Sequence, residues 1–166
     1  MKPITLLNTG IFPALVELQN HHEIPFSPHA SRFLLAIALQ ESNLSARRQV
    51  VANGAEAGPA ASFWQFEQGG GVKGVLTHHA VAGKMKAVCE AYNVLPTPAG
   101  LWEAMRYQDI VAACAARLLI YTLPGALPTT ADQAWQQYLS AWRPGKPKPD
   151  KWASYWKMAG ETVGVA

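Results

Sequence analysis

The residues best suited to chemistry are carboxylates, and Glu41 comes first among them. It follows the apolar run Phe33–Leu39, so it lies at the end of a segment that we expect to be a buried helix. A carboxyl at the edge of an apolar surface is partly desolvated, which disfavours its charged form and raises its pKa. Such a group can act as a general acid near neutral pH. Taken alone, however, Glu41 fits an ordinary solvated glutamate at a helix end better.

A second segment brings aromatic, amide and acidic side chains together. It reads Phe63-Trp64-Gln65-Phe66-Glu67 and follows a chain break at Gly58-Pro59. The pattern predicts a short strand or an extended groove wall over 63–66, with one face buried and the other exposed. Glu56 and Glu67 add two carboxylates on either side of Phe63.

Other catalytic motifs are poorly supported. The sequence has no GxSxG, no P-loop and no Cys/His set with metal-ligand spacing. Gly69-x-Gly71-x-x-Gly74 matches the dinucleotide fingerprint, but no βαβ unit surrounds it. The adjacent His21 and His22 would point about 100° apart on a helix and make a poor metal pair. We therefore expect no cofactor and no metal, and carboxylate chemistry remains.

Three blocks in order resemble the lysozyme-like superfamily, specifically goose-type lysozymes and soluble lytic transglycosylases. Residues 35–42 (LAIALQES) resemble the helix that ends in the family's catalytic Glu-Ser pair. Residues 58–67 (GPAASFWQFE) resemble its glycine-rich segment that ends in Gly-Leu-Met-Gln. Residues 138–145 (YLSAWRPG) resemble its Tyr-Asn-Ala-Gly element. The resemblance implies a general acid at Glu41.

The resemblance also implies roles for residues around that acid. Gln65 matches the family's groove glutamine and Tyr138 its groove tyrosine. Glu67 and Glu56 match the two further acidic positions of goose-type lysozymes.

Three residues of the second block depart from the family pattern while standing at its substrate-binding positions. Ser62 replaces a glycine, and Phe63-Trp64 replace Leu-Met. Because the C–H faces of sugars stack on aromatic rings, we expect either Phe63 or Trp64 to contact glycan.

The implied activity is cleavage of the β-1,4 bond between N-acetylmuramic acid and N-acetylglucosamine in peptidoglycan. If Glu67 or Glu56 holds a water molecule on the far face of the sugar, the reaction is inverting hydrolysis. If neither does, the muramoyl C6 hydroxyl closes a 1,6-anhydro ring. Two alternatives stay open: a non-catalytic glycan-binding or virion structural module, and a chitinase-type relative with the same acid.

Length and composition favour a single domain over residues 1–166. The resemblance implies peptidoglycan glycan strands as the partner, and we expect a monomer. A net charge of +3 is too small to indicate nucleic acid. No apolar run approaches the roughly 18 residues of a membrane span, and no secretory signal is recognisable. We expect synthesis in the cytoplasm and delivery to the cell wall through a holin or within a virion. Lys146, Lys148 and Lys151 form either a solvated face or a contact with anionic wall polymer.

The expected fold is mainly α, of the α+β lysozyme-like kind, with a hairpin and an extended segment lining a glycan groove. The buried central helix should cover residues 28–42, beginning at Ser27-Pro28, and Asn53-Gly54 should turn the hairpin. Cys89 and Cys114 are expected as reduced core cysteines. Further helices are expected at 13–22, from about 72, and at 80–94, 99–122, 133–141 and 150–158, the last ending at Gly160.

Overall fold

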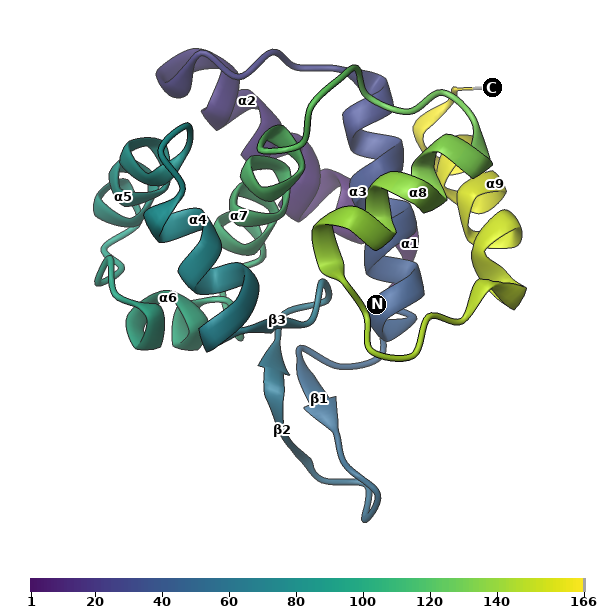
Figure 1. Cartoon of the computed structure of the whole chain (residues 1–166), viewed down its shortest axis with the longest axis horizontal. Helices are drawn as coiled ribbons and strands as arrows, with labels where there is room; N and C mark the ends of the chain where they lie inside the picture. Colours follow the sequence, from purple (N-terminus) through teal and green to yellow (C-terminus); the bar gives the residue numbers. More distant parts are fainter. Residues whose placement is uncertain (166) are drawn as a thin grey trace.

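The computed structural model describes residues 1–165 and is mainly helical, with one small antiparallel sheet (Figure 1). The helices are α1 (Pro3–Leu6), α2 (Phe12–His22), α3 (Pro28–Ser42), α4 (Lys73–Thr77), α5 (Ala82–Ala91), α6 (Pro98–Ala104), α7 (Asp109–Tyr121), α8 (Ala131–Trp142) and α9 (Trp152–Val163). The strands, in sheet order, are β1 (Arg48–Val50), β2 (Glu56–Ala61) and β3 (Phe66–Glu67). Among the described residues, no helix has the length and apolarity needed to cross a membrane.

Helix α3 is the buried centre of the fold, which confirms the prediction from the apolar run. It begins where the Ser27 hydroxyl accepts a hydrogen bond from the His29 N–H at 3.2 Å, with Pro28 in the first turn. Every residue from Ala30 to Leu39 is buried. Helix α9 packs along it, and α8 crosses it in the view of Figure 1. The end of α3 therefore delivers Glu41 from the core to the region of the sheet.

The hairpin of β1 and β2 also agrees with the sequence. Arg48 lies opposite Ala61 and Val50 opposite Glu56, and Gly54 has a φ of +81°, which glycine adopts without strain. The hairpin projects away from the helices (Figure 1). The Asn53-Gly54 signal thus marks the turn correctly.

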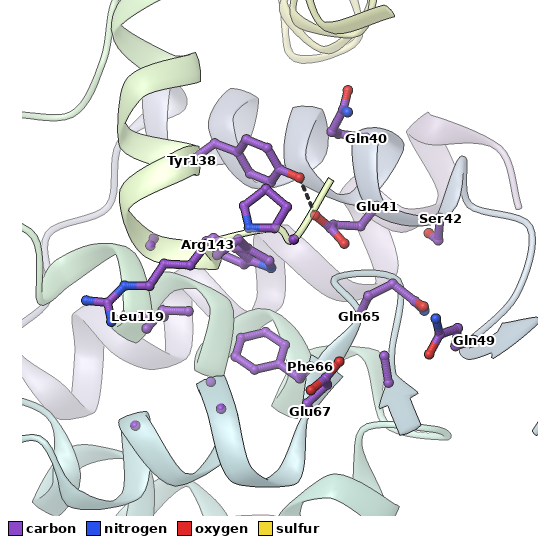
Figure 2. Close-up of a pocket in the computed structure, with 18 of the residues that line it drawn as sticks. Gln40, Glu41, Ser42, Gln49, Gln65, Phe66, Glu67, Leu119, Tyr138 and Arg143 are labelled. Carbon is purple, nitrogen blue, oxygen red and sulfur yellow. Dashed lines mark hydrogen bonds between the residues drawn. The ribbon is translucent and has the colours of Figure 1, made fainter. Parts of the chain in front are cut away.

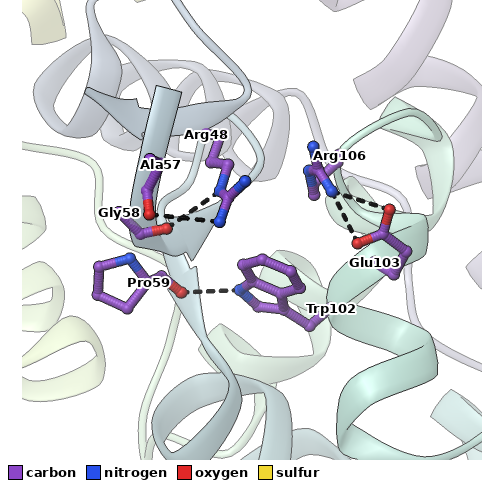
Figure 3. Close-up of polar contacts among 7 residues, drawn as sticks. All are labelled: Arg48, Ala57, Gly58, Pro59, Trp102, Glu103 and Arg106. Carbon is purple, nitrogen blue, oxygen red and sulfur yellow. Dashed lines mark hydrogen bonds and ion pairs between the residues drawn. The ribbon is translucent and has the colours of Figure 1, made fainter. Parts of the chain in front are cut away.

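The base of the hairpin is tied to α6 by polar contacts (Figure 3). The Trp102 indole N–H donates to the Pro59 carbonyl at 2.8 Å. Arg48 Nε donates to the Gly58 carbonyl at 3.2 Å, and its guanidinium lies 5.5 Å from the centre of the Trp102 ring. These contacts fix β2, and with it the segment that follows, relative to the helices.

The predicted helix over 99–122 is wrong as a single helix, because the chain breaks between α6 and α7. Gln108 has a non-helical ψ of 89°. Helix α7 begins at Asp109, whose carboxylate accepts two hydrogen bonds from Arg47, at 2.8 and 2.7 Å. A Cβ on Gly10 would lie 3.2 Å from Asp109 Cβ, so α7 starts in close contact with the N-terminal helical run. Local periodicity shows none of these tertiary contacts.

The Arg47–Asp109 pair gives a stability prediction. Asp109→Ala is expected to lower the free energy of unfolding by about 1–2 kcal/mol, because it removes two charge-assisted hydrogen bonds to a partly exposed arginine. Urea denaturation measures the loss. Glu103→Ala is the control, since it breaks the exposed Arg106–Glu103 pair and should change stability little. Equal losses of unfolding free energy from the two variants would contradict a stabilising role of the Arg47–Asp109 pair.

Both ends of the chain are more helical than expected. A helix was predicted from Pro13, but the chain is helical from Pro3 through a π turn at Leu7–Ile11. At the other end, α9 continues past Gly160 to Val163, and Gly164 caps it with a φ of +81°. A Cβ on Gly160 would lie 2.8 Å from the guanidinium carbon of Arg32, so this glycine allows close packing instead of ending the helix.

Candidate active site

An open cavity of about 1230 Å³ lies where the end of α3 meets the sheet, α4, the ends of α7 and α8, and the loop 143–148. Four of the residues expected from the sequence line it: Glu41, Gln65, Glu67 and Tyr138 (Figure 2). We call this cavity the Glu41 groove.

Glu41 lies in the last turn of α3 and is partly buried. Burial raises the pKa of its carboxyl, because desolvation penalises the charged form. The Tyr138 hydroxyl donates to Glu41 Oε1 at 2.6 Å, and this hydrogen bond opposes the shift by favouring the charged form. Burial is the larger cause, so the carboxyl holds its proton to a higher pH than an exposed glutamate.

Tyr138 is held in place by an aromatic stack. Its ring centre lies 5.3 Å from that of Trp152 at an interplanar angle of 19°, and 5.2 Å from that of Trp135. Burial and the neighbouring Glu41 carboxylate both raise the pKa of the phenol, so it stays protonated and remains a donor. The stack therefore fixes the hydroxyl that contacts Glu41.

The predicted strand over 63–66 is wrong: residues 62–65 form a tight turn, and β3 begins only at Phe66. Ser62 and Gln65 have φ values of +67° and +53°, and the Gln65 N–H donates to the Ser62 carbonyl at 3.2 Å. A turn lacks the two-residue alternation of a strand. Phe63 and Trp64 consequently both enter the core, with exposed fractions of 2% and 0%. Neither ring is therefore exposed for contact with glycan, contrary to the exposed face expected from the sequence.

The turn is joined directly to the helices beside it. The Ser42 hydroxyl lies 2.9 Å from the Phe63 carbonyl, which links the end of α3 to the turn. The Trp142 indole N–H donates to the Trp64 carbonyl at 2.8 Å, which links the end of α8. The Gln65 amide donates to the Ser62 carbonyl at 2.8 Å. The position of Gln65 is therefore coupled to that of Glu41.

The three remaining candidates lie in different places relative to the Glu41 groove. Glu67 is exposed on β3, opposite Ala60, and lines the groove. In the view of Figure 2, Gln65 lies between Glu67 and Glu41. Ser62 is fully buried, and its hydroxyl accepts from the Trp64 N–H at 3.1 Å, so it stabilises the turn below the groove. Glu56 is exposed on the hairpin and does not line the groove.

Sequence reasoning missed several polar residues of the groove. Gln40 lines it and donates to the Lys148 carbonyl at 2.8 Å, which ties the loop 143–148 to α3. Arg143, the αL residue after α8, and Gln49 on β1 also line it. The signal for Arg143 was the basic stretch directly after the helix that carries Tyr138.

Metal ligands and thiols are the other side chains that could carry chemistry. Among residues 1–165, no group of three or more His, Cys, Asp or Glu side chains could hold a metal ion. Cys89 and Cys114 are free and buried, as predicted. Burial raises the pKa of the Cys89 thiol to about 11, so both cysteines are core residues without nucleophilic character.

The raised pKa of Glu41 gives a prediction about stability. The Glu41 carboxyl contributes favourably to the free energy of unfolding while it is protonated. This contribution is fully present below the pKa of an unfolded glutamate, and it is lost as the pH rises through the raised pKa of the folded state. Glu41→Gln removes the cost of burying a charge, so the variant should match the wild type near pH 3 and exceed it near pH 8. Thermal unfolding at pH 8 should therefore give a higher Tm for the variant than for the wild type. Glu90→Gln on the exposed face of α5 is the control. A variant less stable than wild type at pH 8 would contradict burial as the cause.

No protein-family model, curated protein or solved structure matches this chain. The functional assignment therefore rests on the geometry of the Glu41 groove.

Proposed function

We propose that the protein cleaves the β-1,4 glycosidic bond between N-acetylmuramic acid and N-acetylglucosamine in peptidoglycan, with Glu41 as the general acid. One observation carries the proposal: a partly buried carboxyl with a raised pKa lines a large open groove. Tuning the pKa of one carboxyl upward by burial is how glycosidases keep a proton available near neutral pH.

The lining of the groove supports a glycan substrate. Sugar hydroxyls need both donors and acceptors, and amide side chains supply both. The groove offers two such amides, Gln49 and Gln65, together with the cations Arg143, Lys146 and Lys148. The cations suit a polymer that carries carboxylates, which peptidoglycan does and chitin does not.

The proposed step transfers the Glu41 proton to the glycosidic oxygen as the bond from this oxygen to the anomeric carbon breaks. The leaving sugar keeps the proton as a hydroxyl, and Glu41 becomes a carboxylate that accepts the Tyr138 hydrogen bond. Glu67 acts as the general base: it takes one proton from the water whose oxygen attacks the anomeric carbon, which gives inverting hydrolysis. If the muramoyl C6 hydroxyl attacks instead, Glu41 takes its proton and a 1,6-anhydro product forms.

Digestion of purified peptidoglycan, followed by mass spectrometry, tests the proposal. The expected products are glycan fragments with muramoyl ends, either reducing or lighter by one water. Reducing ends identify hydrolysis, and the lighter ends identify the anhydro route. Cleavage of chitin oligomers without cleavage of peptidoglycan would select a chitinase-type enzyme. Binding to peptidoglycan without any cleavage would select a non-catalytic module.

Tyr138→Phe is expected to change the pH dependence of this activity. The hydrogen bond from Tyr138 lowers the pKa of Glu41, so its removal raises that pKa further. A general acid must be protonated, so the alkaline limb of the profile of kcat/KM against pH should move to higher pH. Tyr155→Phe, at another tyrosine of the groove, is the control. A shift of the alkaline limb to lower pH would contradict the assigned contact.

A further inference from the structure

A second cavity, of about 470 Å³, lies beneath the loop 122–130 that joins α7 to α8. The segment between α2 and α3 contributes Pro25 and Ser27 to its wall, α7 contributes its last turn, and α8 contributes Gln137. Figure 1 shows this loop crossing the end of the molecule away from the hairpin. Only Leu123 lines both this cavity and the Glu41 groove, so the two are separate sites on the described chain.

Arg117 makes this second cavity unusual. The side chain of this α7 residue lines the cavity, the residue is only 5% exposed, and its enclosed Nε has no hydrogen-bond partner among residues 1–165. Its guanidinium carbon lies 5.6 Å from the centre of the Tyr121 ring. By contrast Arg32, the other buried arginine, donates from Nε to the Trp156 carbonyl at 3.2 Å.

A buried guanidinium that lacks a hydrogen-bond partner at Nε destabilises the folded protein. An arginine does not lose its proton in a protein, so it cannot become neutral as a buried lysine or glutamate does. Its charge needs a counter-ion or hydrogen-bond acceptors. No aspartate or glutamate lines this cavity within the described chain. The cavity therefore presents a positive charge that the protein itself leaves uncompensated.

We propose that this cavity binds a small organic carboxylate, whose two oxygens accept hydrogen bonds from the guanidinium of Arg117. The planar guanidinium matches the two oxygens of a carboxylate. The rest of the wall is largely apolar and suits a short hydrocarbon body: Pro25, Ile120, Leu123, Ala126 and Leu127. A volume of about 470 Å³ lies within the range of small-molecule sites. A single cation with apolar walls suits a monoanion better than a phosphate.

Calorimetric titration of the full chain with hexanoate tests this proposal, and hexanamide and inorganic phosphate serve as matched probes. Hexanoate is expected to bind, and Arg117→Met should weaken it at least about tenfold, as expected for loss of a charge-assisted hydrogen bond. Hexanamide has no charge to pair with Arg117. Its affinity for the wild type should therefore be no higher than the affinity of hexanoate for Arg117→Met. Arg106→Met, which removes an arginine outside the cavity, should leave the affinity unchanged.

Three results would overturn the proposal: no hexanoate binding to the folded wild type, equal binding by Arg117→Met, or equal binding of hexanamide. Binding of phosphate in preference to hexanoate would overturn the ligand class. If Arg117→Met does not fold, Ala126→Trp replaces it, because a large side chain from the loop should fill the cavity and abolish binding while Arg117 stays. Undiminished binding by that variant would equally overturn the site.

Thermal unfolding supplies a second readout. Hexanoate should raise the Tm of the wild type and leave that of Arg117→Met unchanged, because a ligand stabilises only the state that binds it. Without ligand, Arg117→Met should be at least as stable as the wild type, since it removes an uncompensated buried charge. A large loss of Tm in the unliganded variant would show that Arg117 also supports the fold, and hexanoate binding by Ala126→Trp would then decide the binding role.

Discussion

Glu41→Gln is expected to slow the release of glycan fragments from peptidoglycan by about 10²–10⁴-fold, the contribution typical of a general acid. Glutamine keeps the volume of the side chain and can still accept the hydrogen bond from Tyr138. It has no acidic proton to give to the leaving oxygen. The groove should therefore stay intact while chemistry stops, so kcat should fall and KM should change little.

Two matched variants make this result interpretable. Glu56→Gln should keep full activity, because Glu56 does not line the groove. Glu67→Gln should lose activity if water is the nucleophile, and should keep it if the product is the 1,6-anhydro sugar. Wild-type activity in Glu41→Gln would remove the basis of the proposed function, whatever the other two variants do.

Trp64→Ala is expected to lower the free energy of unfolding by about 3–5 kcal/mol, the loss typical of truncating a buried aromatic residue. Trp64 is fully buried beneath the groove, and its indole N–H donates to the Leu34 carbonyl of α3 at 2.9 Å. The substitution leaves a cavity and removes this hydrogen bond. Urea denaturation measures the effect.

Two further variants separate support of the fold from contact with substrate. Trp102→Ala, at a half-buried tryptophan on α6, should cost clearly less stability. Trp64→Phe keeps most of the apolar volume and should retain a wild-type KM, because Trp64 lies in the core below the turn. A raised KM in Trp64→Phe with unchanged stability would show instead that this side chain contacts glycan.

Much of the scaffold could be predicted because its signals are local. The Ser27-Pro28 start and the apolar run that follows define α3, and Asn53-Gly54 defines the hairpin turn. Thr130 caps α8 by accepting from the Gln133 N–H at 3.3 Å. Of the proposed site, Glu41 and Tyr138 come together because one ends the central helix and the other lies on the helix beside it.

The mistaken predictions share a physical cause: long-range contacts decide the local conformation. Ser62 and Gln65 adopt positive φ values within a turn that α3 and α8 hold in place, and no glycine marks that turn in the sequence. The start of α7 depends on Arg47, which is 62 residues from its partner Asp109. Arg117 is a buried residue of α7, and the periodicity of that helix does not reveal the cavity beside it.

The proton on Glu41 can be followed directly by NMR with glutamate labelled at its side-chain carboxyl. The signal is assigned by its absence in Glu41→Gln, and its titration is compared with the alkaline limb of the activity profile. We predict that Glu41 titrates clearly above the ~4.3 of an unperturbed glutamate, and that the activity falls over the same pH range. If Glu41 titrates like an exposed glutamate, or if activity persists well above its measured pKa, then this carboxyl is not the acid.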